Sequence, residues 1–285
     1  MLETDPRPGS GAASVRIERR SPYVDATRAM PARLAVFDPA GWIANLELLL
    51  GRLGRAGAIA VDLRANAYGH GLDRCAGLLA ALAAERGQEL LPVVSEGERT
   101  GSAPGAGSAP VIGSAPIIGP ESFGLVEGAG TRPVLRLEAE IMLVKEVAAG
   151  EAISYGRSYP VEAPTRTGLV AIGYSDGAVR RASSACEALA GGRRCRIAGA
   201  ISMDQLVLDL GDAPAESGDR AVLYGDGADG GPTAREWAAR TGIPAPAITA
   251  RIAPTVERGE CSSTRFDAAS AGVPGAGAET EEGAR

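Results

Sequence analysis

A short repeat at residue 101 limits what the chain can build on either side of it. The stretch "GSAPGAGSAPVIGSAP" repeats Gly-Ser-Ala-Pro three times with a period of six residues. Such a period is compatible with a hexapeptide β-solenoid or with a low-complexity linker. Three copies that each contain proline offer too few apolar side chains to stack a solenoid core. The sequence therefore favours a linker over residues 101–117, with a folded part before it and another after it.

Strands and helices alternate over residues 32–100, before the repeat. Apolar runs predict strands at about 33–37, in "AGAIAVDL" and in "ELLPVVS". Helical spacing of apolar residues predicts one helix after Asp38 and a second one from Leu72, which ends at Gly87. A strand–helix–strand–helix–strand order implies parallel pairing with right-handed crossovers. We therefore expect an α/β segment here.

The part that follows the linker, residues 118–259, has a different character. Short strand-like runs recur at regular spacing, among them "VLRLEAEIMLVKEV", "AISYG", "TGLVAIGYSDG", "DRAVLYGDG" and a strand pair around the Gly-Ala turn of "RRCRIAGAISMDQLVLDLG". This spacing predicts a compact β-domain, with one short helix capped by Thr233. The flanking segments 1–31 and 260–285 are rich in small and polar residues and are predicted to be disordered tails.

Composition excludes several classes of protein. The four cysteines form no C-x-x-C pair and the chain has a single histidine, so we expect structural thiols and no metal site. A net charge of −6 argues against nucleic-acid binding. No apolar run reaches the roughly 20 residues that span a bilayer, and the first residues lack the order of a signal peptide, so we expect a cytoplasmic protein with no membrane partner. Every basic residue except Lys145 is an arginine.

The densest group of polar and aromatic residues is the loop "VDLRANAYGHG", residues 61–71, where a predicted strand ends. Such a position is typical of active sites in α/β proteins. It contains Arg64, Tyr68 and His70. An arginine is a poor base or nucleophile because it stays protonated. Following a glycine, His70 is expected to orient the backbone rather than to take part in catalysis.

Four motifs, in this order, resemble the alanine racemase family: "ANAYGHG", "VKEVAAGEAISYGRSY", "AIGYSDG" and "GAISMDQLVLDL". The resemblance covers roughly residues 32–98 and 118–258. It implies a PLP-dependent homodimer with a (β/α)8 barrel and a β-rich C-terminal domain. In this family a lysine forms an imine with PLP, and this lysine and a tyrosine from the partner subunit exchange the α-proton. Arg64 stands at the lysine position, and Tyr155 matches the tyrosine.

The resemblance also assigns binding roles. Tyr68 and Tyr174 match tyrosines on the phosphate side of the cofactor. Met203 and Asp204 match the Met-Asp pair that lines the substrate pocket across the dimer. Lys145, the one alternative amine, matches a strand outside the pocket and is expected to be a structural surface residue.

The chain departs from the family at further points. Ile117 replaces the arginine expected at the ring nitrogen of PLP, and Pro246 falls near the position of another phosphate-contacting tyrosine. An eight-fold barrel takes roughly 250 residues, whereas residues 32–130 supply about 100. The sequence thus predicts a partial TIM-like barrel fragment followed by the family's C-terminal β-domain. Since open strand edges need cover, we expect a homodimer formed through the C-terminal domain, or a partner chain.

Three functional hypotheses follow. The favoured one is an alanine-racemase-like protein without PLP racemase activity, because Arg64 replaces the lysine and the barrel is short, retained as a binding or assembly module. The second is an active PLP-dependent alanine or amino-acid racemase. The third is a cofactor-free enzyme that uses Tyr155 and Arg64 on an amino-acid-like substrate.

Overall fold

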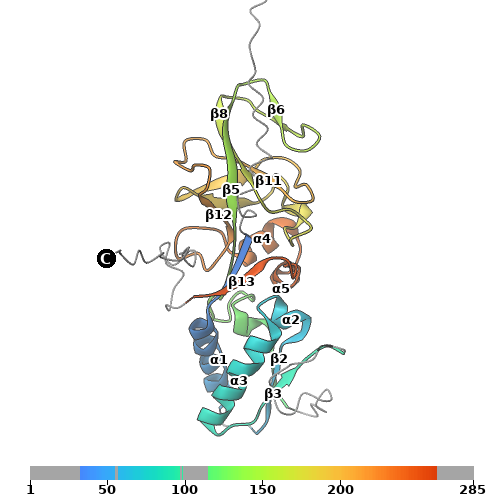
Figure 1. Ribbon diagram of the computed structural model, residues 1–285. Coiled ribbons are helices and arrows are strands. Elements are labelled where there is room, and N and C mark those ends of the chain that lie inside the picture. The colour runs from blue at the N-terminus through green and yellow to red at the C-terminus, as the bar shows by residue number, and fades with distance from the viewer. Residues whose placement is uncertain (1–32, 55–56, 97, 99–114, 262–285) are drawn as a thin grey trace, which may run out of the picture. The chain divides into compact units, whose positions relative to one another are not determined.

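The computed structural model describes residues 33–54, 57–96, 98 and 115–261 of the chain (Figure 1). The predicted tail 1–31, most of the predicted linker 101–117 and most of the predicted tail 260–285 lie outside these residues. The described residues belong to a single compact unit. Within them, no helix is both long enough and apolar enough to cross a membrane.

The first part of the chain forms a three-stranded parallel sheet with helices. The strands β2 (Ile59–Asp62), β3 (Leu90–Val93) and β4 (Ile117–Ile118) run in the order β3-β2-β4. The helix α1 (Pro39–Leu53) starts where the Asp38 side chain accepts a hydrogen bond of 2.8 Å from the amide of Gly41. The helix α3 (Leu72–Arg86) ends at Gly87 in a left-handed conformation, as predicted.

The first strand within the described residues does not join this sheet. We expected residues 33–37 to pair in parallel with the following strand, and this prediction is wrong. The strand β1 (Arg33–Phe37) instead pairs antiparallel with β5 (Leu135–Val147) and parallel with β13 (Glu257–Glu260). Where β1 ends, the amide of Asp38 donates a 2.9 Å hydrogen bond to the carbonyl of Val134. The local pattern identified a strand but could not name its distant partners.

The β-rich character predicted for the part after the linker is confirmed, but the β-domain does not begin at residue 118, because Ile118 pairs with β2 in the parallel sheet. The main sheet of the β-domain has the order β12-β9-β10-β11-β8-β5-β1-β13, and β12 also pairs with β5, so that six of the strands close into a ring. The predicted strand pair around the Gly-Ala turn is present as β10 and β11. A short hairpin of β6 and β7 stands apart from the ring. The remaining bounds are β6 (Ala152–Ile153), β7 (Tyr159–Pro160), β8 (Thr165–Val170), β9 (Glu187–Ala190), β10 (Arg193–Ile197), β11 (Leu206–Asp209), β12 (Arg220–Tyr224), α4 (Ala234–Thr241) and α5 (Ala245–Thr249).

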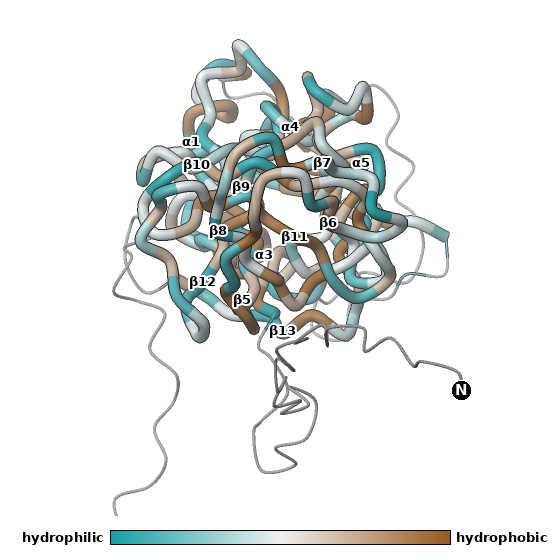
Figure 2. The backbone as a smooth tube through the Cα atoms, turned by 90° about the horizontal axis from the view of Figure 1, so that it is seen from above, coloured by the Kyte–Doolittle hydropathy of each residue, from teal (hydrophilic) through white to brown (hydrophobic). Residues whose placement is uncertain are grey.

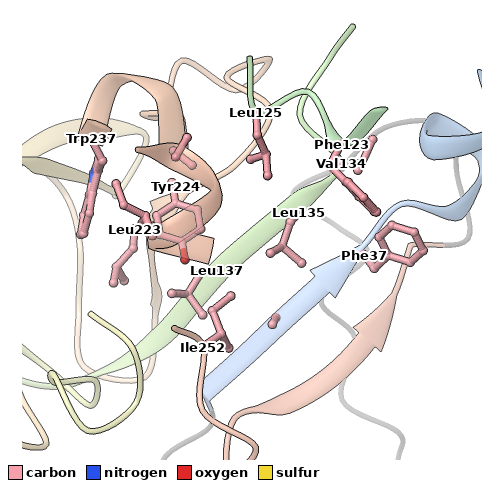
Figure 3. Close-up of a cluster of buried hydrophobic side chains, with 14 of the residues drawn as sticks. Phe37, Phe123, Leu125, Val134, Leu135, Leu137, Leu223, Tyr224, Trp237 and Ile252 are labelled. Carbon is pink, nitrogen blue, oxygen red and sulfur yellow. The ribbon is translucent and has the colours of Figure 1, made fainter. Parts of the chain in front are cut away.

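One hydrophobic cluster runs through both parts of the described chain. Phe37 on β1 and Leu135 and Leu137 on β5 lie in it, with Tyr224 and Trp237 of the β-domain (Figure 3). It also includes Ile59 and Val61 of β2, Trp42 of α1 and Leu79 of α3. Most residues of β11 are hydrophobic, and several outer loops contain hydrophilic residues (Figure 2). The two parts therefore share their core.

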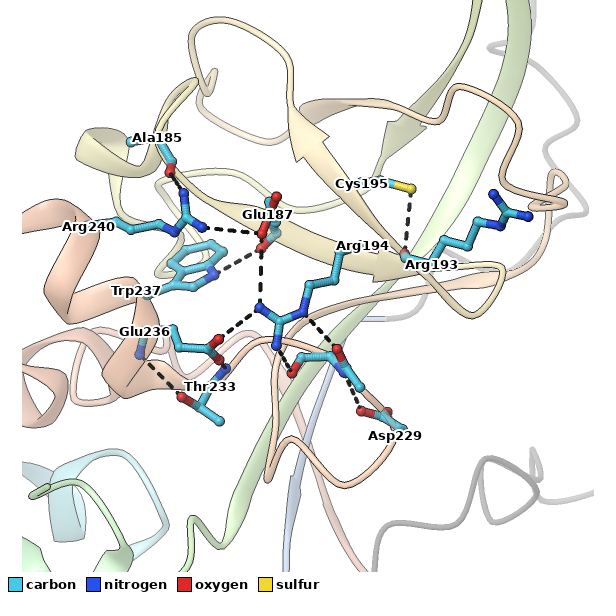
Figure 4. Close-up of polar contacts among 12 residues, drawn as sticks. Ala185, Glu187, Arg193, Arg194, Cys195, Asp229, Thr233, Glu236, Trp237 and Arg240 are labelled. Carbon is cyan, nitrogen blue, oxygen red and sulfur yellow. Dashed lines mark hydrogen bonds and ion pairs between the residues drawn. The ribbon is translucent and has the colours of Figure 1, made fainter. Parts of the chain in front are cut away.

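The helix α4 is fixed to the β-domain by a polar network (Figure 4). Thr233 caps the helix, as predicted: its hydroxyl accepts from the amide of Glu236, and the Glu236 carboxylate accepts from the amide of Thr233. Arg194 on β10 donates to Glu236 at 2.8 Å, and Trp237 donates its indole N–H to the carbonyl of Glu187 at 3.0 Å. All four cysteines are buried free thiols.

Candidate functional site

The first candidate site lies at the carboxyl end of β2, where Arg64 is paired with a buried carboxylate. The Arg64 Nε and Nη2 donate to the two oxygens of Asp62 at 2.9 and 2.6 Å. The hydroxyl of Tyr68 donates to the same carboxylate at 2.6 Å. Asp62 is almost fully buried, whereas the Arg64 side chain is 59% exposed. Both predicted residues of this loop thus converge on one acceptor.

This pairing fixes the charge state of all three groups. Burial by itself would raise the pKa of Asp62, but the hydrogen bonds from Arg64 and Tyr68 outweigh it and lower that pKa. The Asp62 carboxylate raises the pKa of Arg64, and burial together with the hydrogen bond to Asp62 raises the pKa of Tyr68. Arg64 therefore stays a cation and Tyr68 stays a neutral phenol, so neither group can act as a general base.

The backbone after Arg64 forms a left-handed turn. Residues 65–68, Ala-Asn-Ala-Tyr, have φ angles between 52° and 56°. For residues other than glycine this conformation costs roughly 1–2 kcal/mol each, so the surroundings must hold it. The side-chain oxygen of Asn66 accepts a hydrogen bond of 2.7 Å from the backbone amide of Leu72. The backbone amide of Asn66 donates one of 2.7 Å to the Glu98 carboxylate. Arg258 of β13 donates to the carbonyl of Gly69.

His70 supports this turn rather than facing a substrate. Its Nδ1 lies 2.8 Å from the carbonyl oxygen of Ala67 and 3.2 Å from that of Tyr68. Its ring packs between Phe37 and Phe123 and is fully buried. Burial lowers the pKa of His70 to about 3, so the imidazole is neutral at physiological pH. The prediction that this histidine orients the backbone is confirmed.

The second candidate site is a hollow in the β-domain, here called the tyrosine hollow. Its volume is about 380 Å³. Four of its lining residues were predicted as site residues, from three separate motifs. The lining residues are Tyr155, Tyr174, Arg180, Ile201, Ser202, Met203, Asp204 and Gln205.

The walls of the tyrosine hollow are joined by close backbone contacts. Gly173 packs so tightly against the carbonyl of Met203 that a Cβ atom there would lie 2.1 Å from the oxygen, so only glycine fits. The Ser175 hydroxyl lies 2.8 Å from the carbonyl oxygen of Met203 and 3.0 Å from the Asp204 carboxylate, and its single proton can be donated to either acceptor. These contacts bring Tyr174 and Asp204 to the same hollow.

Arg180 adds a positive charge to the tyrosine hollow. Its guanidinium lies 5.3 Å from the ring centroid of Tyr174, which is the geometry of a cation–π contact. The predictions did not include this residue, although the pair Arg180–Arg181 stands close behind "GYSDG" in the sequence. The hollow thus offers phenol groups, one guanidinium and one carboxylate.

The two candidate sites share no lining residue. None of the described residues of the β2 loop lines the tyrosine hollow. Arg64 and Tyr155, the two predicted catalytic residues, are therefore not brought together within the described chain. Ile117 is 54% exposed at β4, Lys145 is exposed on β5, and Pro246 lies in α5.

Comparison with known proteins shows which proteins the chain resembles. Residues 134–259 match the family model described as alanine racemase, C-terminal domain. The chain is 45% identical over 130 residues to an alanine racemase from Beutenbergia cavernae and 46% identical over 129 residues to one from Streptomyces coelicolor. Residues 134–259 are thus similar to the C-terminal domain of alanine racemases. These alignments take in 45% of the chain but only 34% and 33% of the relatives, so the chain spans about a third of the length of the curated relatives that it matches.

Solved structures extend the likeness of fold beyond the C-terminal domain. The alanine racemase of Streptomyces coelicolor superposes with a TM-score of 0.64 at 25% identity, covering 81% of this chain and 98% of that one. The enzyme of Bartonella henselae, solved with covalently bound pyridoxal phosphate, superposes with a TM-score of 0.62 at 16% identity, covering 81% and 99%. The chain therefore has an alanine-racemase-like fold.

The residues of the β2 loop do not fit a pyridoxal phosphate held through an amine. A guanidinium is delocalised and stays protonated, and that of Arg64 is already bound to Asp62. Ile117 offers no charge at the position where the resemblance places an arginine, and the Tyr68 hydroxyl donates to Asp62.

The interpretation of the sequence missed Asp62, which organises this site. The signal was available, because Asp62 is the one charged residue in the apolar run "AGAIAVDL". A carboxylate in a buried strand needs a partner, and the nearest cation in the sequence is Arg64. Glu98 gave no such signal, since its contact with the turn joins the ends of two strands.

Proposed function

We propose that this protein is an alanine racemase relative without pyridoxal-phosphate racemase activity and that it serves as a binding or assembly module. The observation that carries the proposal is the two-pronged contact of Arg64 with buried Asp62. A residue held in this way provides no amine for the cofactor and no base for an α-proton.

The architecture supports the same proposal. We infer that the three-stranded parallel sheet is the remnant of a (β/α)8 barrel. Its strands β2 and β3 follow each other in the chain, whereas β4 comes after the repeat and pairs on the other side of β2. A barrel shortened in this way lacks the strands that would complete a cofactor pocket.

The assembly role is proposed for the tyrosine hollow. Tyr155, Met203 and Tyr174 are 72%, 56% and 43% exposed, which is high for large side chains. Tyrosine, methionine and arginine are enriched in protein interfaces, and Arg180 lies against Tyr174 in the same hollow. We propose that a second copy of the chain covers this face in a homodimer.

The cofactor part is tested with the purified full chain and added pyridoxal phosphate. We expect no visible chromophore that survives borohydride reduction and gel filtration, and no deuterium exchange at the α-carbon of alanine in heavy water. A retained chromophore in the wild type would overturn the proposal, and α-exchange without added cofactor would favour a cofactor-free enzyme.

Arg64→Lys tells whether only the nucleophile is missing. A chromophore retained by this variant but not by Arg193→Lys, an exposed control on β10, would show that the cofactor pocket survives. No retention by either variant would assign the loss to the shortened sheet.

The assembly part is tested by sedimentation of the wild type and of the double variant Tyr155→Ala, Met203→Ala. We expect the wild type to sediment as a dimer and the double variant to dissociate at least about tenfold more readily. Leu48→Ala, which changes an exposed apolar residue on α1, is the matched control. A monomeric wild type, or a double variant that dimerises normally, would refute this interface.

A further inference from the structure

A second hollow in the β-domain has walls of opposite charge. It lies between the ring strands β5, β8 and β11 on one side and Glu151 with the start of the β6–β7 hairpin on the other. Its volume is about 360 Å³, near the lower end of the range for small-molecule sites. None of the residues of the tyrosine hollow lines it. We call it the Lys145 hollow.

The pairing of the strands builds an apolar floor. Leu143 of β5 stands opposite Leu169 of β8, and Leu169 stands opposite Val207 of β11. Directly opposite residues in antiparallel strands point to the same face, so these three side chains form a row across the sheet. Ile153 of the hairpin lines the hollow from the other side. Such a floor accommodates an aliphatic group.

The polar groups of the hollow lie around this row. Lys145 is two residues beyond Leu143 on the same strand, and Thr167 stands opposite it. Glu151 lines the hollow as well, immediately before the hairpin strand β6. The Thr167 hydroxyl lies 3.5 Å from the carbonyl oxygen of Lys145, which is the long limit of a hydrogen bond. A ligand acceptor would give that hydroxyl a better partner.

Both charges remain available to a ligand. Within the described residues Lys145 forms no ion pair, and the Glu151 carboxylate takes only a 3.4 Å hydrogen bond from the amide of Ala148. Both side chains are exposed. A cation and an anion beside an apolar floor match a molecule that carries both charges and an aliphatic chain.

We propose that the Lys145 hollow binds a zwitterionic aliphatic amino acid. Its carboxylate would pair with the Lys145 ammonium and accept from Thr167. Its ammonium would pair with Glu151, and its side chain would cover the row of Leu143, Leu169 and Val207. An anionic fatty acid fits less well because Glu151 repels it, and a simple amine is repelled by Lys145.

Lys145 has a second, purely structural explanation as a charge on an unpaired strand edge, and experiment can separate it from ligand binding. Beyond Ile141 the described chain offers one edge of β5 no further strand partner, and lysine on such an edge discourages pairing between copies. That role requires charge at Lys145 but no ligand, and it requires nothing of Glu151.

The experiment exploits the fact that the chain has one lysine. Reductive methylation with ¹³C-formaldehyde labels Lys145 and the terminal amine only, and it keeps the charge of both. The labelled full chain is titrated with L-leucine, 4-methylpentanoate and L-leucinamide. We expect a saturable shift of the Lys145 signal with L-leucine, and at least about tenfold weaker binding of the two analogues that lack one charge.

Variants separate the proposal from the edge role. Glu151→Gln is expected to weaken L-leucine binding about tenfold, whereas Glu146→Gln, a neighbouring exposed glutamate that does not line this hollow, leaves it unchanged. Lys145→Met, followed through the ligand's own NMR signals, is expected to lose binding. The proposal is overturned if L-leucine gives no saturable shift, if 4-methylpentanoate binds equally well, or if Lys145→Met promotes association between copies without changing leucine binding.

Discussion

The β-domain and the parallel sheet of β2, β3 and β4 treat their predicted site residues in opposite ways. In the β-domain Tyr155, Tyr174 and Met203 are exposed around one hollow. At the end of β2, Arg64 and Tyr68 both donate hydrogen bonds to the buried carboxylate of Asp62. The family model matches the first region, residues 134–259, and stops before it reaches the second.

This difference shows that a site that can bind a partner and a site that can react need their side chains in different states. A surface that binds a partner needs side chains whose polar and apolar groups are free, whereas a site whose groups satisfy one another is stable and unreactive. Motifs of one family can therefore persist in a chain either with their side chains exposed or with their polar groups paired to one another. Their chemical meaning depends on what each side chain contacts.

The largest expected effect tests whether the two regions are one folding unit. Each contains one of the chain's two tryptophans, Trp42 stacked on Phe123 and Trp237 packed against Tyr224. Because one hydrophobic cluster includes both, Trp42→Ala is expected to lower the free energy of unfolding by about 3–5 kcal/mol as read from Trp237 fluorescence in urea. Leu48→Ala on the exposed side of α1 should stay within about 0.5 kcal/mol. An unchanged Trp237 transition would mean that the regions unfold independently.

The next effect concerns Asp62. Its replacement by alanine removes the acceptor for Arg64 and Tyr68, and we expect a loss of about 1–3 kcal/mol by urea denaturation at neutral pH. Since the folded state lowers the pKa of Asp62, its contribution is present above the unfolded value of about 3.9 and disappears as the pH falls through the folded value. Glu47→Ala, on the surface of α1, is the control. No loss in Asp62→Ala would show that the Arg64 pairing is not structural.

The third effect depends on pH and on His70. Its folded pKa of about 3 lies below the unfolded value of about 6.5, so the unfolded chain takes up the proton first. Stability is thus fully present above about pH 6.5 and falls by up to about 1.4 kcal/mol per pH unit below it, until the folded value is reached. His70→Gln should remove this part of the slope and leave the profile between pH 7.5 and 8.5 unchanged. Parallel profiles throughout would contradict a buried neutral imidazole.

The smallest effect lies in the β-domain. Thr233→Ala removes the cap of α4, and we expect a loss of about 1 kcal/mol in thermal or urea unfolding. Thr233→Ser keeps the hydroxyl and should recover most of it. If the alanine variant is as stable as the wild type, the network around Arg194 is sufficient to hold the helix.

The sequence predicted local features and ordered motifs well. Helix boundaries at Asp38 and Gly87, the capped helix after Thr233 and the strand pair of β10 and β11 all follow from patterns within a few residues. Tyr155, Met203 and Asp204 line one hollow, and Tyr174, which the resemblance placed with Tyr68 on the phosphate side of the cofactor, lines the same hollow without Tyr68.

Strand partners far apart in the sequence and the ion-pair partners of charged residues were harder to predict. The partners of β1 are Leu135–Val147 and Glu257–Glu260, about a hundred and more than two hundred residues away, and no periodicity in β1 names them. The pairing of Arg64 with Asp62 depends on the rotamer of Arg64 and on the burial of Asp62 rather than on motif spacing. The same holds for Arg258, which contacts the β2 loop from the far end of the chain.

The antiparallel pairing of β1 with β5 has a consequence for how far the segment between them can vary in length. Phe37 and Leu135 stand opposite each other at the end of that pairing, so everything from Asp38 to Val134 is one large excursion between two strands of a hairpin. The entropy of closing such an excursion changes by only about 0.6 kcal/mol when its length doubles or halves. Removing strands from the middle of it therefore leaves the closure of the β-domain almost untouched. In this architecture the segment with the parallel sheet is an insertion, so the entropy of closing the host sheet sets little limit on its length.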